Sequence, residues 1–214
     1  MAIIMNEKEN IESLRKIGGV FSYSQAHQDL FVRKMLDFKK GGYYLEIGAA
    51  EPKQSNNTYI LENEEDWIGL SFDIDQTLVN EFNKQRKNPC VCADATTFDL
   101  EKALKNNNFP NQIDYLSLDI DPAEVTYKAL ENIPHNEFRF SVITYEHDCY
   151  TSGSEHMLMS RKFLESLGYV RVVSNVMVCG RDFEDWYVDP NVIPEAVFKP
   201  FISSNIECRD IFDF

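Results

Sequence analysis

The sequence lacks a long apolar run and is poor in basic residues, and each shortage excludes a class of protein. No stretch approaches the roughly 18 apolar residues of a membrane-spanning helix. The first ten residues, MAIIMNEKEN, hold too short an apolar run for a signal peptide and turn acidic at once. Lysine and arginine number 21 against 35 aspartate and glutamate residues, a formal net charge of −14. We therefore expect a cytoplasmic protein with no membrane segment, and a nucleic-acid partner is disfavoured.

Cysteine is also scarce and shows no metal-binding spacing. The five cysteines are odd in number and include no CxxC pair: Cys90, Cys92, Cys149, Cys179 and Cys208. This pattern predicts reduced thiols without a zinc site of the usual kind. A hydrophobic content of 43% over 214 residues is enough for one well-formed core. We expect a single domain over 1–214, with an N-terminal helical lid region (1–40), a core (41–190) and a C-terminal extension (191–214).

Strand and helix patterns alternate along the chain. Strands are predicted at 43–47, 67–74, 90–93, 113–120 and 138–146. Helices are predicted at 8–16, 26–38, 76–86, 98–106, 123–131 and 155–167. Two last strands, at 169–178 and 184–188, lie close enough in sequence to pair antiparallel. This order predicts an α/β fold, with a mainly parallel seven-stranded sheet, an antiparallel last strand and helices on both faces.

Each of the first five predicted strands ends in acidic residues. These ends are Glu46, Asp73 with Asp75, Asp94, Asp119 with Asp121, and Glu146 with His147 and Asp148. Ligands of parallel sheets bind beyond the carboxyl ends of the strands, where the strand order reverses. Acids at all five ends therefore predict a ligand rich in hydroxyl and amine donors.

The loop after the first strand argues against a phosphate-bearing ligand. Dinucleotide-binding loops place several glycines against a pyrophosphate, whereas EIGAAEP keeps only Gly48 and adds Glu51, which would repel an anion. An NAD site is therefore disfavoured. S-adenosylmethionine fits better, because it carries a sulfonium, an ammonium, ribose hydroxyls and an adenine amine but no phosphate.

Six short blocks of the sequence resemble the FkbM family of S-adenosylmethionine-dependent methyltransferases. They are SQAHQD (24–29), YYLEIGA (43–49), NNTYILE (56–62), WIGLSFDID (67–75), IDYLSLDID (113–121) and EHD (146–148). FEDWYVDP (183–190) also resembles a C-terminal signature of phage and environmental members. The resemblance implies a Rossmann-like class I methyltransferase fold and methylation of a hydroxyl oxygen on a saccharide or small metabolite. Asp121-Pro122 departs from the common Glu-Gly.

Pattern and resemblance together nominate a set of cofactor-binding residues. The set is Glu46, Gly48, Asn57, Asp73, Asp94 and Asp119. Gly48 would allow close approach of backbone and cofactor, Glu46 would serve the methionine region, and Asp73 would bind the ribose hydroxyls, with Asp75 as the competing choice. Asp94 would accept the adenine amine, although a helix-capping role explains it nearly as well.

Catalysis is predicted at the ends of the fourth and fifth strands. His147, with Asp119, is the candidate general base, because histidine changes charge near neutral pH. The alternative is a Mg²⁺ or Ca²⁺ site made by Asp119, Asp121 and Asp148, since hard cations prefer oxygen ligands. Two further hypotheses remain. The protein could be an inactive S-adenosylmethionine-binding module, or it could be a nucleic-acid methyltransferase. The second is disfavoured because DIDPAE stands where amino-methylating members commonly have an NPP-type motif.

Overall fold

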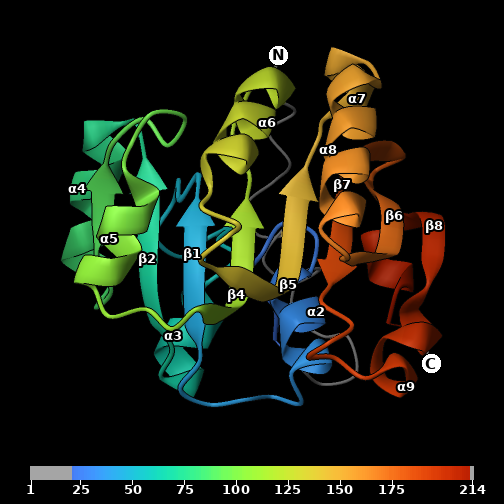
Figure 1. Ribbon diagram of the computed structural model, residues 1–214, viewed down its shortest axis with the longest axis horizontal. Helices are drawn as coiled ribbons and strands as arrows, with labels where there is room; N and C mark the ends of the chain where they lie inside the picture. Colours follow the sequence, from blue (N-terminus) through green and yellow to red (C-terminus); the bar gives the residue numbers. More distant parts are fainter. Residues whose placement is uncertain (1–20, 213–214) are drawn as a thin grey trace.

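The computed structural model describes residues 21–212 of the chain, which form an eight-stranded sheet with helices on both faces (Figure 1). The strand order is β3-β2-β1-β4-β5-β7-β6-β8. The strands are β1 (Tyr43–Ile47), β2 (Ile68–Asp73), β3 (Cys90–Cys92), β4 (Gln112–Leu118), β5 (Arg139–Glu146), β6 (Val170–Val178), β7 (Arg181–Val188) and β8 (Ser203–Glu207). Strands β1 to β5 are parallel, and β7 runs antiparallel to both β5 and β6.

Helical segments connect the strands and cover the sheet. The α-helices are α2 (Gln28–Met35), α3 (Tyr59–Glu65), α4 (Gln76–Gln85), α5 (Leu100–Asn106), α6 (Ala123–Asn132), α7 (Cys149–Ser152), α8 (Glu155–Ser166) and α9 (Glu195–Phe198). Two 3₁₀ turns follow, η1 (Lys199–Phe201) and η2 (Cys208–Asp210). Within residues 21–212, no helix is long and apolar enough to span a bilayer.

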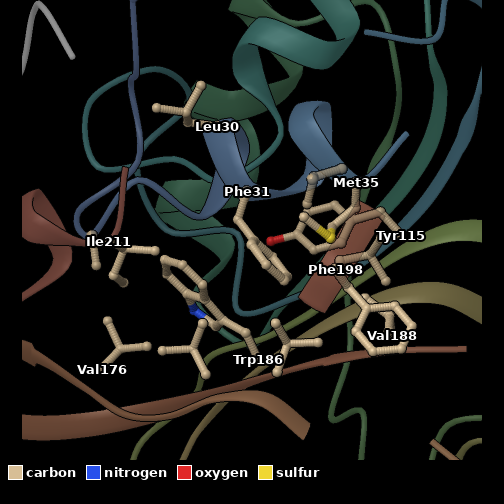
Figure 2. Packing of buried hydrophobic residues seen from close by; sticks show 14 of the residues in the cluster. Leu30, Phe31, Met35, Tyr115, Val176, Trp186, Val188, Phe198 and Ile211 are labelled. Atoms are coloured by element: carbon tan, nitrogen blue, oxygen red, sulfur yellow. The ribbon is translucent and has the colours of Figure 1, made fainter. Parts of the chain in front are cut away.

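Two hydrophobic cores, one on each face, hold the sheet between the helices. Side chains alternate in direction along a strand, so in β1 Tyr44 joins one core and Leu45 the other. The first core packs α2, α3 and the C-terminal segment against the sheet, and the second packs α5, α6 and α8. Figure 2 shows the first core, where fully buried Trp186 of β7 lies against Phe31 of α2, with a ring-centroid distance of 4.7 Å.

The predicted fold class is confirmed, and the structure adds one strand and three short α-helices to it. The sheet has an eighth strand, β8, which pairs parallel to β6 inside the segment that we expected to be a C-terminal extension. Helices α3, α7 and α9 were not predicted either. The antiparallel pairing of the last two predicted strands is confirmed as β6 with β7. The helix predicted at 8–16 lies outside the described residues.

The sheet order reverses between β1 and β4, and this reversal positions the site. From β1 the chain moves outward to β2 and β3, then returns to β4 on the other side of β1. Helices diverge on either side of such a point and leave a crevice beyond the carboxyl ends of the two central strands. In Figure 1 the arrowheads of β1, β4 and β5 point to this same edge.

Candidate functional site

A cavity of about 780 Å³ lies beyond the carboxyl ends of β1 to β4, at the point where the strand order reverses. This volume is in the range of small-molecule and cofactor sites. All six residues predicted to bind a cofactor line it: Glu46, Gly48, Asn57, Asp73, Asp94 and Asp119. Gln25, from the predicted lid region, lines it too. The structure therefore brings together residues that span more than 70 positions of the sequence.

Gly48 is required by the path of the backbone. Its φ angle is +91°, a region that residues with a side chain rarely adopt. A Cβ atom added to Gly48 would lie 1.8 Å from the carbonyl oxygen of Asp119. The backbone just beyond β4 therefore passes too close to this loop for any side chain at position 48, and the backbone of Gly48 forms part of the cavity wall.

Asp73 and Asp75, which the sequence left as competitors, have different surroundings. Asp73 ends β2 and lines the cavity, where its carboxylate accepts hydrogen bonds from the backbone amides of Ala50 (2.9 Å) and Asp75 (2.8 Å). Asp75 is the N-cap of α4, accepting from the backbone amides of Thr77 and Leu78. Asp75 thus satisfies the orphan donors of a helix start, and Asp73 is the acid that faces the cavity.

Asp94 combines a local structural role with a place in the cavity wall. One of its carboxylate oxygens accepts from the backbone amide (2.9 Å) and hydroxyl (2.6 Å) of Thr96, which lowers the pKa of Asp94. The helix cap that we considered for Asp94 belongs to Asp99, whose carboxylate accepts from the backbone amide of Lys102. Among the described residues, both side-chain hydrogen bonds of Asp94 go to this one oxygen, Oδ1.

Glu46 is almost completely buried and is held by side-chain donors. Its Oε1 accepts from Asn56 Nδ2 (3.2 Å) and Thr58 Oγ1 (3.0 Å), and its Oε2 accepts from Ser71 Oγ (2.7 Å). Burial raises the pKa of Glu46 to about 7, although the positive charge of Arg86 opposes the rise. Glu46 is therefore both part of the cavity wall and the centre of a buried polar network.

Arg86 completes this network and was missed by the sequence analysis. Its guanidinium pairs with Glu62 Oε2 at 2.9 Å and donates to Asn56 Oδ1, Thr58 Oγ1 and the hydroxyl of Tyr44. A fully buried guanidinium needs such partners. The network fixes the loop before α3, which carries Asn57 into the cavity. No local pattern marks Arg86, because its partners lie 24 or more positions away in sequence.

Asn57 offers an acceptor to the cavity. Its Nδ2 donates to Ser117 Oγ of β4 at 2.9 Å, which fixes the orientation of the amide. Its Oδ1 is buried and has no hydrogen-bond partner among the described residues. A buried acceptor without a donor is costly, so a donor on a bound ligand would relieve it.

His147 does not line the cavity. Its side chain is fully buried, and its Nε2 lies 3.5 Å from Asp185 Oδ1. Asp185 also accepts two hydrogen bonds from Arg161 of α8 (2.7 and 2.9 Å), and the backbone amide of His147 donates to Phe183 at 2.6 Å. The expected general base thus lies in a buried ionic cluster that joins β5, β7 and α8. This geometry does not favour a proton-transfer role.

The acids beyond β4 and β5 do gather, although they form no metal centre. Asp119 and Asp121 line the cavity, and Glu146 and Asp148 lie beside them. Burial and the neighbouring acids raise the pKa of both Glu146 and Asp148. Across residues 21–212, no group of three or more His, Cys, Asp or Glu side chains is arranged to hold a metal ion. The Mg²⁺ or Ca²⁺ site predicted from Asp119, Asp121 and Asp148 therefore has no support.

Comparison with known proteins identifies the fold but no family. No family model and no curated protein matches the sequence, so the FkbM resemblance has no support beyond the blocks that suggested it. Among solved structures, a protein assigned as an rRNA methylase of Clostridium thermocellum matches with a TM-score of 0.53 and 14% identity, over 79% of this chain and 97% of that one. An rRNA methylase of Streptococcus thermophilus matches with a TM-score of 0.50 and 8% identity, over 75% and 94%. The chain thus has a Rossmann-like methyltransferase fold.

Proposed function

We propose that this protein is an S-adenosylmethionine-dependent methyltransferase. The observation that carries the proposal is the cavity at the reversal of strand order, with bare backbone at Gly48 and carboxylates at Asp73 and Asp94. Its donor and acceptor set fits a ligand with hydroxyls, amines and positive charge. The unpartnered Oδ1 of Asn57 adds an acceptor for an ammonium group.

Each residue of the cavity wall has a role that follows from its chemistry. Asp73 keeps lone pairs free after accepting two backbone amides, and a carboxylate at the end of β2 is placed for ribose hydroxyls. The free oxygen of Asp94 would accept the adenine amine. Ile74, which is 74% exposed and lines the cavity, would bury apolar surface against the adenine ring. Asn57 and Asp119 would bind the ammonium of the methionine portion.

When bound, S-adenosylmethionine supplies a methyl group on a sulfonium, which an acceptor takes by in-line displacement. The protein's contribution is then to align the acceptor and to accept its proton. Methylation of a saccharide or metabolite hydroxyl, which the FkbM resemblance implies, would require a base near the cavity. His147 is not in that position, and the acids beyond β4 and β5 are.

The alternative acceptor is a nucleic acid, and the net charge of the protein argues against it. The structural neighbours include proteins whose names assign them to rRNA methylation. Binding a phosphate backbone depends on clustered lysine and arginine, whereas this chain carries a net charge of −14 and acids around its cavity. A small-molecule acceptor is therefore the better proposal.

Calorimetry tests the proposal directly. The protein should bind S-adenosylmethionine and its demethylated product S-adenosylhomocysteine, and should show no binding of NAD. Binding of NAD together with no response to either sulfur compound would overturn the proposal. If both sulfur compounds bind and no methyl group is transferred to hydroxyl, amine or RNA acceptors, the protein is an S-adenosylmethionine-binding module without turnover.

A further inference from the structure

Lys53 lies against the aromatic rings of two tyrosines from different parts of the chain. Its Nζ is 5.6 Å from the ring centroid of Tyr23 and 5.3 Å from that of Tyr59. The two rings also contact each other, with a centroid distance of 4.7 Å. An ammonium within about 6 Å of a tyrosine ring centroid is attracted by the π-electrons of that ring. We call Tyr23, Lys53 and Tyr59 the tyrosine–lysine clasp.

The clasp joins two separate segments of the cavity wall. Tyr23 belongs to the segment 21–27, which precedes α2 and places Gln25 in the wall. Lys53 belongs to the loop between β1 and α3, and residues of this loop on both sides of Lys53 line the cavity. The two segments are not neighbours in the sequence. The contact between Lys53 and Tyr23 therefore bears on the position of Gln25 relative to the loop.

The loop that carries Lys53 depends on such contacts for its shape. Ala50 and Ser55 have φ angles of 44° and 51°, in the left-handed region, which is strained for residues that have a side chain. The carbonyl oxygen of Pro52 accepts from Arg86 Nη1 at 3.0 Å, which fixes one point of the loop. Lys53 forms no ion pair within residues 21–212, although acidic residues outnumber basic ones in the chain. Its ammonium is therefore held by the two rings.

Each tyrosine of the clasp is itself fixed to the body of the fold. The backbone amide of Tyr23 donates to Asp29 Oδ2 of α2 at 2.7 Å. Tyr59 is the first residue of α3, and Arg86 Cζ lies 5.6 Å from its ring centroid. Arg86 in turn belongs to the buried network around Glu46. The clasp thus connects α2 to this network.

Gln25 offers an unused hydrogen-bond donor to the cavity. It is exposed, and its side-chain amide forms no hydrogen bond with the other described residues. A side-chain amide carries two N–H donors. S-adenosylmethionine has a carboxylate on its methionine portion, and none of the roles proposed above serves this group. A carboxylate needs donors, whereas the acids elsewhere in the cavity wall would repel it.

We propose that Gln25 binds the methionine carboxylate of the cofactor, and that Lys53 is the positioning residue that holds Gln25 in reach of it. This inference rests on the proposed function. Asn57, the proposed partner of the ammonium, belongs to the same loop as Lys53. The ammonium and the carboxylate are bonded to one carbon atom, so their partners have to lie close together. The clasp keeps them close, because it joins the two segments that carry them.

Two related ligands test this inference by calorimetry. S-adenosylhomocysteine carries the carboxylate, and 5′-methylthioadenosine lacks the amino-acid portion. Gln25→Ala should weaken S-adenosylhomocysteine binding about tenfold or more, because it removes a hydrogen bond to a charged group. Lys53→Met should weaken it about two- to fivefold, the strength of an exposed cation–π contact. Both variants should bind 5′-methylthioadenosine as the wild type does. Equal weakening of the two ligands would overturn the inference, since it would show a general effect on the structure.

Matched variants separate the clasp from the charge of Lys53. Tyr23→Leu keeps that charge and should weaken S-adenosylhomocysteine binding as Lys53→Met does, and in the double variant the two effects should not add. Lys53→Arg keeps a cation over the rings and should retain the wild-type affinity. Lys162→Met, an exposed change on α8, should alter nothing. A loss in Lys53→Met that Tyr23→Leu does not share would overturn the positioning role.

Hydrogen exchange of the free protein distinguishes failure of this inference from failure of the proposed function. In Lys53→Met the backbone amides of 21–27 should exchange about two- to fivefold faster than in the wild type, because the segment opens more often without the clasp. Unchanged exchange would overturn the positioning role. If neither ligand binds, the proposed function fails, whereas the exchange rates still decide whether Lys53 holds this segment.

Discussion

Replacing Glu46 by Gln changes the charge of a buried group while keeping its hydrogen bonds. The glutamine Oε1 can still accept from Asn56 and Thr58, which now bond the same oxygen of Glu46. The new Nε2 can donate to Ser71 Oγ, because a serine hydroxyl both donates and accepts. The variant should therefore fold like the wild type and differ from it mainly in the titration of position 46.

The size of the effect follows from the pKa of Glu46. Burial raises this pKa from 4.5 to about 7, so the folded state holds a proton that the unfolded chain releases. The stability contributed by this group is fully present below pH 4.5 and is lost as pH rises toward the folded-state value. At 1.36 kcal/mol per pH unit, the total loss is about 3 kcal/mol, of which about 2.5 kcal/mol falls between pH 5 and pH 8.

Urea unfolding of both proteins at pH 5, 6, 7 and 8 measures this loss. The free energy of unfolding of Glu46→Gln minus that of the wild type should increase by about 2.5 kcal/mol over this range. Effects of other titrating groups cancel in the difference. Glu64→Gln, an exposed change on α3, serves as the control. Its free energy of unfolding should change with pH as that of the wild type does. If the free energy of unfolding of Glu46→Gln changes with pH as that of the wild type does, burial does not raise the pKa of Glu46 and the argument is wrong.

Three further substitutions test the cavity and the buried ionic cluster. Asp73→Ala should weaken S-adenosylhomocysteine binding by about 1–3 kcal/mol in calorimetry, which is the value of hydrogen bonds to a charged group. An unchanged affinity would show that another residue binds the ribose. Gly48→Ala should lose cofactor binding and unfold at a lower temperature, because the new methyl group would overlap the carbonyl of Asp119; a wild-type affinity would contradict the close approach. Asp185→Ala should cost about 3–5 kcal/mol in urea unfolding by stranding Arg161; a loss below 1 kcal/mol would show that the pair adds little.

The mainly parallel sheet and the acids of the cavity wall could be predicted because both depend on local patterns. Alternating strand and helix segments imply parallel strands, and parallel strands bring their carboxyl ends to one edge. The cavity therefore forms where acids at the ends of the first four strands come together, with Gly48 and Asp73 at its wall. Short elements escaped this reasoning. Helix α3 has only 7 residues, and β8 is a 5-residue edge strand without clear alternation.

The place of His147 could have been predicted by a stricter use of side-chain alternation. Neighbouring side chains of a strand point to opposite faces, so His147 and Glu146 cannot both face the same ligand. Glu146 pairs with Glu184 on one face, whereas Tyr145 and His147 share the face of Asp185 and α8. The partners of His147 come from distant segments. No pattern within a single stretch of sequence reveals them.

Hydrogen-bond partners and position separate the acids that stabilise the fold from those that line the cavity. Strand-end position alone did not distinguish them, since Asp75 caps α4 while Asp73, two residues away, faces the cavity. Glu46 is buried with three donors and a nearby arginine, so the protein itself satisfies it. Glu184 is buried as well, and the side chains of Gln28 and Trp186 lie within hydrogen-bonding reach of its carboxyl group. An acid is therefore a candidate for ligand binding only where it lines the cavity and keeps lone pairs free, as Asp73 does after accepting from two backbone amides.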